Sequence, residues 1–350
     1  MQTILILCGG ESGEHEVSLQ SAHSIARFIP RDRYRVVMVG IDKSGHWVTG
    51  DPLFQNVDDP SSIALAENLE PAKLERRCLN GEKIDAVFPI IHGTHGEDGS
   101  LQGLLQMQHL PYVGSGVLGS AVGMDKDLMK RLLLHAGLNC ARHVVIYSWQ
   151  KTPPTYHELA ETLGPILFVK PCNLGSSVGI SKVSQASEYA KAISYALEFD
   201  TKVIVESFID GREIEISVLG NERTEASVPG EIIPGGDFYS YDAKYIDSGK
   251  TRLVIPADLP PDCVLEIQEI AKKSFRLLEM AGMARVDFFV EQDGKIWVNE
   301  LNTLPGFTNI SMYPKLWEAT GLPYPELIHR LIQLAINRFQ GEERLRRNRF

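Results

Sequence analysis

The segment ARVDFFVEQDGKIWVNELN, residues 284–302, is the most informative stretch for the carboxyl half of the chain. Its two apolar halves are separated by Asp293 and Gly294, a pair preferred in two-residue turns of β-hairpins. Because side chains two apart on a strand share a face, counting back from that turn predicts a patch of four polar side chains. They form two opposed pairs, Asp287 with Glu300 and Arg285 with Asn302.

This polar patch has the composition of a site for a metal and phosphate. Two facing carboxylates repel each other unless a cation or a proton lies between them. The oxygens of Asp287, Glu300 and Asn302 are hard ligands suited to Mg²⁺ that is shared with substrate phosphates. Arg285 could neutralise a transferring phosphoryl group or an oxyanion. The alternative is a solvated hairpin face with a cross-strand ion pair, and the hairpin alone does not separate the two.

A glycine-rich loop, NLGSSVG at residues 173–179, follows a strand that ends at Lys170 and Pro171. Glycines let a backbone approach a ligand closely, and successive N–H groups form a concavity that binds anions. Lys170 could reach a phosphate from the strand end. Such loops also serve as simple flexible connections, so this signal is weak by itself.

The first third of the chain alternates strand-like and helix-like segments. Apolar runs at 3–8, 35–41 and 86–91 predict buried parallel strands of a doubly wound α/β domain. Polar loops at 9–18 and 92–99 follow the first and third strands and should meet at one edge of the sheet. Neither loop has the dinucleotide fingerprint, and the acidic residues of the first suit a substrate ammonium better than a pyrophosphate.

Composition restricts the remaining possibilities. The chain has 350 residues and a formal net charge of −10, which argues against nucleic acid as its main partner. No apolar run approaches the roughly 20 residues of a membrane span, and the first residues lack the pattern of a signal peptide. The five cysteines are scattered, which favours a cytoplasmic protein without a disulfide framework. A glycine-rich break at 114–123 and a long polar loop at 235–250, a candidate lid, suggest further divisions.

Taken together, the motifs closely resemble the D-alanine–D-alanine ligases of the ATP-grasp superfamily, from residue 3 to about residue 339. The matching strings, in chain order, are GGESGEHEVSL, HGTHGEDGSLQG, MDK, FVKP, LGSSVGI, DAKY, RVDFF and VNELNTLPGFT. The resemblance implies an N-terminal parallel-sheet domain that binds substrate, residues 1–122, followed by two α+β domains that form the ATP-grasp. The expected limits are 123–212 for the central subdomain, 213–340 for the catalytic domain and 341–350 for a disordered basic tail.

The same resemblance implies the reaction. The expected enzyme uses ATP and two Mg²⁺ ions, for which Mn²⁺ can substitute, and joins two D-alanines through a D-alanyl phosphate. The product would serve peptidoglycan precursor synthesis in the cytoplasm, and the family implies a homodimer that acts without nucleic acid or membrane. Two alternatives share these motifs, a D-alanine–D-lactate ligase and an inactive ATP-grasp binding protein. An NAD-dependent oxidoreductase is disfavoured by the missing fingerprint.

Site residues carry over position by position. Lys126, Lys170 and the lid residue Lys244 match the family's contacts to the ATP phosphates. Glu206 and Ile209 match its contacts to the adenine, and Glu213 matches its contact to the ribose. The magnesium ligands are matched by Asp287, Glu300 and Asn302. The first substrate is matched by Glu16 for its ammonium, with the linked Ser176 and Tyr245, and by His92. The oxyanion is matched by Arg285 and the Gly306 N–H, and the second carboxylate by Ser311 and Met312.

Overall fold

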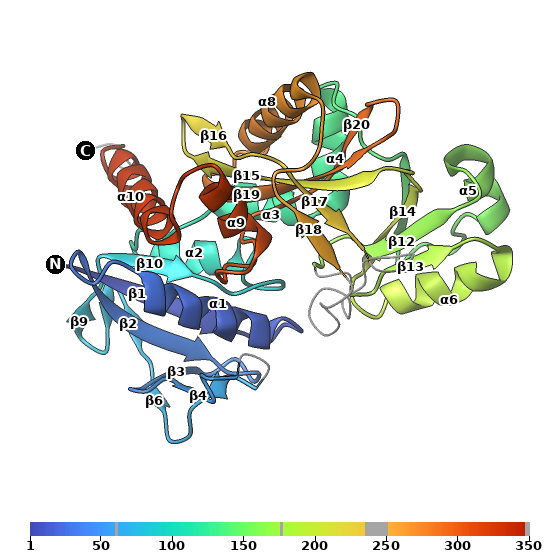
Figure 1. Ribbon diagram of the computed structural model, residues 1–350. Coiled ribbons are helices and arrows are strands. Elements are labelled where there is room, and N and C mark those ends of the chain that lie inside the picture. Colours follow the sequence, from blue (N-terminus) through green and yellow to red (C-terminus); the bar gives the residue numbers. More distant parts are fainter. Residues whose placement is uncertain (60–61, 176–177, 235–250, 347–350) are drawn as a thin grey trace.

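A computed structural model of the chain describes residues 1–59, 62–175, 178–234 and 251–346 (Figure 1). The predictions made for Ser176, Lys244 and Tyr245, and for the lid that contains the last two, lie outside these residues. Three sheets, each with its own helices, account for most of the described fold. Among the described helices, none is both long and apolar enough to cross a bilayer.

The N-terminal sheet has the strand order β10-β1-β2-β3-β6. Its parallel centre consists of β1 (Gln2–Gly9), β2 (Tyr34–Ile41) and β10 (Ala86–Pro89), as the apolar runs predict. Alternate β1 residues face opposite sides: Ile4 and Ile6 pack in the core that contains α1 (His15–Phe28), whereas Leu5 and Leu7 pack with α2 (Ser100–Met107). This doubly wound arrangement confirms the predicted fold class for the domain.

The edge of this domain is antiparallel and was not predicted. The chain turns back through β3 (Trp47–Thr49) and β6 (Glu70–Pro71), which extend the sheet beyond β2. Short ribbons complete the region, formed by β4 (Phe54–Gln55) with β5 (Ala64–Leu65), and by β7 (Leu74–Glu75), β8 (Cys78–Leu79) and β9 (Glu82–Lys83).

The glycine-rich stretch predicted as a break contains a helix instead. Helix α3 (Val117–Met124) runs through it, because its glycines allow close packing rather than a turn. A Cβ on Gly119 would lie 2.5 Å from the backbone oxygen of Glu279. Helix α4 (Lys126–His135) follows, and the Asp125 side chain caps it by accepting a hydrogen bond from the Leu128 N–H at 3.0 Å.

The central unit has an antiparallel sheet in the order β11-β14-β12-β13. Its strands are β11 (His143–Tyr147), β12 (Leu167–Pro171), β13 (Ser181–Val183) and β14 (Lys202–Ser207). Helices α5 (Tyr156–Leu163) and α6 (Ala186–Ala196) share its apolar core. A capping box between Thr155 and Glu158 begins α5, which fixes where that helix leaves the preceding loop.

The carboxyl-terminal sheet runs β18-β17-β15-β19-β20, with β16 beside β15. These strands are β15 (Arg212–Gly220), β16 (Thr224–Ala226), β17 (Gly230–Ile233), β18 (Arg252–Val254), β19 (Gly282–Val290) and β20 (Ile296–Asn302). Helix α8 (Pro261–Leu277) packs with α4 in the core of this sheet, although α4 falls inside the limits expected for the central subdomain. Helix α9 (Met312–Ala319) lies between this sheet and the N-terminal domain (Figure 1).

The last described helix, α10 (Tyr324–Glu343), packs against the N-terminal domain. It runs beyond residue 340, where the basic tail was expected to begin. Its residues Leu327 and Leu331 are fully buried in the same core as Ile4 and Ile6 of β1. The N-terminal and carboxyl-terminal domains therefore share one hydrophobic core.

The β19–β20 hairpin differs from the prediction twice, and the two differences cancel. Glu291 N–H bonds to Lys295 O at 3.0 Å, so the turn has three residues rather than two, with Gly294 at φ +86°. A β-bulge then shifts the register: Phe288 faces Val298, but Asp287 faces Glu300, which leaves Asn299 as the extra residue. The predicted pairs, Asp287 with Glu300 and Arg285 with Asn302, are therefore confirmed.

Candidate active site

Two cavities meet at the β19–β20 hairpin. The first, of about 270 Å³, lies between the central sheet and the carboxyl-terminal sheet. The second, of about 400 Å³, lies between the carboxyl-terminal sheet and the N-terminal loops. Both are lined by Gly175, Glu215 and Glu300. A group that reacts at this junction can therefore be reached from both sides.

The first cavity gathers seven of the predicted residues: Lys126, Lys170, Glu206, Ile209, Glu213, Asp287 and Glu300. Two aromatic side chains that sequence reasoning missed, Phe168 and Phe208, also line it. Their rings stack with centroids 6.1 Å apart, and the Lys182 ammonium lies 5.4 Å from the Phe208 ring. This cavity thus combines flat apolar surface with charged groups, as a nucleotide requires.

Lysines surround the Glu206 carboxylate. Lys170 Nζ lies 2.7 Å from Glu206 Oε2, and Lys130 Nζ lies 3.1 Å from Oε1. Burial opposes ionisation of Glu206, but the two ammonium groups outweigh it and lower its pKa to about 2. Burial likewise opposes the charge of Lys170, yet Glu206 outweighs it and raises the lysine pKa. Both groups are therefore charged at neutral pH.

Lys126 lies in the part of the first cavity next to the glycine-rich loop and Glu300. Its Nζ donates to the Leu174 carbonyl at 2.6 Å, in the loop after β12, and lies 3.9 Å from Glu300 Oε2. Asn173 in the same loop is held by Asp200, which accepts from the Asn173 backbone N–H at 2.8 Å. The described part of the glycine-rich loop is thereby fixed beside the metal-type carboxylates.

Arg285 and Asp287 form the centre of the hairpin patch. Arg285 donates from Nε and Nη2 to the two Asp287 oxygens, each at 2.7 Å, and Asn302 Nδ2 donates to Asp287 Oδ2 at 3.0 Å. Glu215 Oε2 lies 3.1 Å from Arg285 Nε. Burial disfavours the guanidinium charge, but Asp287 and Glu215 outweigh it and raise the Arg285 pKa well above its ordinary value.

The donor set fits a magnesium ion that is shared with a nucleotide. Asp287, Glu300 and Asn302 come to one face of the hairpin, at the junction of the cavities. Within the described residues, no three or more His, Cys, Asp or Glu side chains form a metal cage of their own. Mg²⁺ bound through one or two carboxylates plus substrate phosphates needs no such cage.

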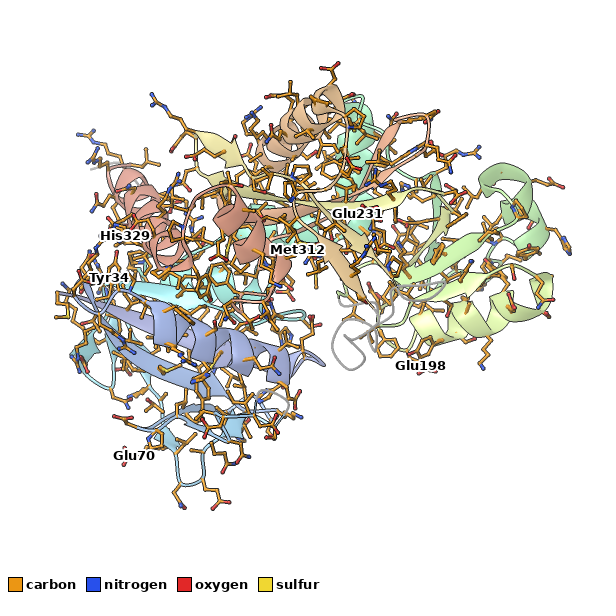
Figure 2. All side chains as sticks on the ribbon, viewed as in Figure 1. Tyr34, Glu70, Glu198, Glu231, Met312 and His329 are labelled. Atoms are coloured by element: carbon orange, nitrogen blue, oxygen red, sulfur yellow. The ribbon has the colours of Figure 1, made fainter. Side chains whose placement is uncertain are left out.

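The second cavity contains the remaining described predictions except Glu16: His92, Arg285, Asn302, Gly306, Ser311 and Met312. Met312, labelled in Figure 2, is the first residue of α9. His92 is buried, its Nδ1 lies 2.9 Å from the Leu304 carbonyl, and its Nε2 lies 3.3 Å from Ser21 Oγ. Burial lowers the His92 pKa, so the ring is neutral and donates from Nδ1 to the carbonyl.

Glu16, which was expected at the substrate ammonium, does not line the second cavity. Its side chain is 47% exposed and forms an ion pair with Lys43. Glu14 lines the cavity instead, is 9% exposed and lies against Gly93 and Gly175. Side chains two apart at a helix start point in different directions, so only one of these carboxylates can face the cavity.

Glu97 also lines the second cavity, and the sequence did not predict it as a site residue. Its carboxylate accepts from the Gly93 N–H at 2.7 Å and from the Leu304 N–H at 3.1 Å, linking an N-terminal loop to the loop after β20. Burial and the neighbouring Glu14 raise its pKa to about 8. The polar loop at 92–99 is evident in the sequence, but no local pattern distinguishes Glu97 from the other polar residues in it.

The first cavity suits a nucleotide, and it meets the second cavity at a patch of side chains that suits Mg²⁺. This arrangement fits an ATP-grasp ligase. The family models for the D-ala D-ala ligase N-terminus and C-terminus match residues 3–115 and 132–333. The chain therefore belongs to the D-alanine–D-alanine ligase family, and the fold class predicted for all three domains is confirmed.

Individual relatives agree with this assignment. The chain is 49% identical to D-alanine–D-alanine ligase A of Escherichia coli strain K12, covering 97% of each chain. It is 50% identical to the D-alanine–D-alanine ligase of Oceanobacillus iheyensis, covering 98% of each. Among solved structures, the D-alanine–D-alanine ligase of Coxiella burnetii superposes with a TM-score of 0.84 at 38% identity, covering 98% of this chain and 97% of that one. The VanG D-Ala:D-Ser ligase of Enterococcus faecalis gives 0.84 at 33% identity, covering 95% and 99%.

Proposed function

We propose that this enzyme uses ATP to join two D-alanines into D-alanyl-D-alanine, through a D-alanyl phosphate, for peptidoglycan precursors made in the cytoplasm. The observation that carries the proposal is the junction of the two cavities at Glu300, with Arg285 and Asp287 beside it. ATP in the first cavity would present its γ-phosphate to a carboxylate held in the second. The named relatives support the choice of D-alanine.

For the nucleotide, we assign the phosphates to Lys126 and Lys170, the ribose to Glu213, and the adenine to Glu206, Ile209 and the Phe168–Phe208 pair. Asp287, Glu300 and Asn302 would hold two Mg²⁺ ions, or Mn²⁺ in their place. A bound divalent cation neutralises phosphate charge and polarises the transferring group. Because ATP and a carboxylate nucleophile repel, the lysines must offset charge that would otherwise keep the reactants apart.

For the first D-alanine, we assign the ammonium to Glu14 in place of Glu16, with His92 beside the substrate. Ionic pairing at a buried carboxylate orients the amino acid so that its carboxylate points towards the first cavity. That carboxylate attacks the γ-phosphorus, which forms an acyl phosphate and releases ADP. Lys244, Ser176 and Tyr245 remain assignments of the resemblance, because they lie outside the described residues.

For the second D-alanine, we assign the carboxylate to Ser311 and Met312 at the start of α9. Its amine attacks the acyl carbon, and the resulting oxyanion accepts hydrogen bonds from Arg285 and the Gly306 N–H. Collapse of this tetrahedral species forms the peptide bond and releases inorganic phosphate. Water exclusion matters because an acyl phosphate hydrolyses, so both cavities must be closed during these steps.

The test follows one oxygen atom. D-alanine labelled with ¹⁸O in its carboxylate is incubated with the enzyme, ATP and Mg²⁺, and the phosphate is analysed by mass spectrometry. If the carboxylate attacks the γ-phosphorus, one labelled oxygen appears in each phosphate formed. Phosphate without label, formed together with dipeptide, would contradict the acyl phosphate. An inactive ATP-grasp binding protein would form neither phosphate nor dipeptide.

We also propose that the chain is a homodimer. Four apolar side chains on adjacent helices α2 and α3 are exposed: Leu104 (42%), Met107 (80%), Val117 (39%) and Leu118 (61%). We call this set the α2–α3 patch. Clustered large apolar side chains on a surface are typical of protein interfaces, and a second copy of the chain would cover them.

A further inference from the structure

The bulge residue Asn299 has a partner outside the hairpin. A bulge leaves the extra residue out of the ladder, so its backbone groups need another partner. The Asn299 carbonyl accepts a hydrogen bond from Lys130 Nζ at 3.1 Å. This contact joins α4 to the strand position directly before Glu300.

Lys130 is among the most deeply buried charged groups in the described chain. Its side chain is 1% exposed, and it lines neither of the two cavities. Its second partner is Glu206, at 3.1 Å, on the wall of the first cavity. A buried ammonium is costly unless it is paired, so its place here requires that both partners stay in position.

The charges around Glu206 explain why two lysines are present. Lys170 lines the first cavity, whereas Lys130 lies behind the wall, and both contact the same carboxylate. A nucleotide phosphate would compete with Glu206 for Lys170. Lys130 would then remain as the counterion that keeps Glu206 ionised and in place.

We infer that Lys130 is a positioning residue: it holds the Asn299 bulge, and with it the Asp287–Glu300 register, in line with the nucleotide wall. Without the bulge, continuing the register from Phe288 and Val298 would place Asp287 opposite Asn299 instead of Glu300. The inference rests on the proposed function of Glu300 as a metal ligand. It predicts that loss of Lys130 weakens metal binding without removal of any ligand.

The same strand edge offers a matched control. Asn139, on the segment after α4, donates from Nδ2 to the Ile296 carbonyl at 3.1 Å, while its own carbonyl accepts from the Val298 N–H at 2.8 Å. Asn139→Ala removes a side-chain hydrogen bond to β20 but leaves the bulge contact. It should therefore leave metal binding within about twofold of the parent.

The experiment measures Mn²⁺ binding by electron paramagnetic resonance in the presence of a non-hydrolysable ATP analogue. Lys130→Met should raise the Mn²⁺ dissociation constant about 10- to 100-fold, the range seen when groups that orient metal ligands are removed. Lys130→Gln, whose amide can still donate to the Asn299 carbonyl, should recover at least half of that loss on a logarithmic scale. If Lys130→Met does not fold, as judged by circular dichroism, Lys130→Gln is compared with Lys130→Ser, which is too short to reach the carbonyl.

A Glu206→Gln background separates positioning from simple charge balance. If Lys130 acts through Asn299, Lys130→Met still weakens Mn²⁺ binding when residue 206 is neutral. If the effect disappears in that background, Lys130 is only a counterion and the inference is overturned. Mn²⁺ binding unchanged in Lys130→Met overturns it as well. Glu300→Gln is tested alongside, and normal binding there would contradict the proposed metal site rather than the role of Lys130.

Discussion

At the residue scale, Glu14 and Glu16 differ in exposure although they are only two positions apart. Glu14 is 9% exposed and lines the second cavity, whereas the Glu16 side chain is 47% exposed and pairs with Lys43. We predict that Glu14→Gln raises KM for D-alanine at the first site by at least about tenfold, because the variant loses one charge-assisted hydrogen bond to the substrate ammonium. Glu16→Gln, the matched control, should stay within about twofold.

Steady-state kinetics over a range of D-alanine concentrations measures both variants. The roles of the two glutamates would be reversed if Glu16→Gln showed the larger rise in KM. The sequence motif contains both carboxylates, and the resemblance was applied to Glu16, the more exposed of the two. Burial decides between them, and a motif carries no information about which side of a helix start faces a cavity.

Glu97 gives a prediction about pH. Its pKa is about 8 in the folded protein, against an ordinary value of 4.5. Because the folded state retains a proton that the unfolded state has released, Glu97 lowers stability progressively as pH rises from about 4.5 to about 8. Glu97→Gln loses one acceptor for a backbone N–H, so it should be less stable than the parent at pH 5.

That difference in stability should narrow towards pH 9, because the variant does not have this titration. Thermal unfolding of both proteins between pH 5 and pH 9 measures it. A gap that stays constant between pH 5 and pH 9 would mean that Glu97 is ionised throughout that range. Two backbone donors would then outweigh burial and Glu14, the reverse of what the contacts indicate.

At the element scale, helix α3 packs against the chain after α8 through glycine. A Cβ at Gly119 would lie 2.5 Å from the Glu279 carbonyl oxygen, closer than atoms can approach. Gly119→Ala should therefore lower the free energy of unfolding by about 1–3 kcal/mol, as overpacking does elsewhere. Gly103→Ala on α2 is the control, since its nearest neighbour is 4.0 Å away and alanine favours a helix by about 1 kcal/mol.

Urea unfolding of both alanine variants checks this prediction, and equal effects at the two positions would contradict the packing argument. The helix itself shows a limit of prediction from sequence. Glycines usually interrupt helices, so the sequence predicts a break at 114–123. The close packing of Gly119 against Glu279 joins residues far apart in sequence, so no local pattern predicts it.

The hairpin shows how far local rules reach. The Asp-Gly turn and strand alternation predicted the facing pairs Asp287–Glu300 and Arg285–Asn302, which the structure confirms. The path to them was wrong, because the turn has one more residue and the bulge at Asn299 compensates for it. A bulge held by Lys130 depends on a helix more than 150 residues earlier in the chain, so strand periodicity could not predict it.

At the scale of the whole molecule, the first and last elements share a core. The helical periodicity of the residues in α10 indicates only that one face is buried and not what covers it. The covering surface is β1 and its neighbours, so the N-terminal domain is fixed to the carboxyl-terminal domain. The second cavity depends on this docking, since its walls come from both domains.

The α2–α3 patch predicts the oligomeric state. Placing a charge in an interface of apolar side chains should separate the subunits, so Met107→Glu with Leu118→Glu should sediment with half the parent mass at micromolar concentration. Leu265→Glu is the control, because Leu265 is 60% exposed on α8, outside this patch. Sedimentation velocity measures whether each protein is a monomer or a dimer. A parent that sediments as a monomer, or a double variant that remains dimeric, would contradict the proposed interface.

The structural relatives include a D-Ala:D-Ser ligase as well as D-alanine–D-alanine ligases, so the function depends on which acceptor this enzyme uses. The most direct measurement incubates the enzyme at pH 7 with ATP, Mg²⁺ and equal concentrations of D-alanine, D-serine and D-lactate. Products are identified by mass spectrometry, and the amount of ADP formed is measured. We predict D-alanyl-D-alanine as the main product, with one ADP for each dipeptide. A majority of D-alanyl-D-serine or D-alanyl-D-lactate, or ADP without any condensed product, would contradict the account.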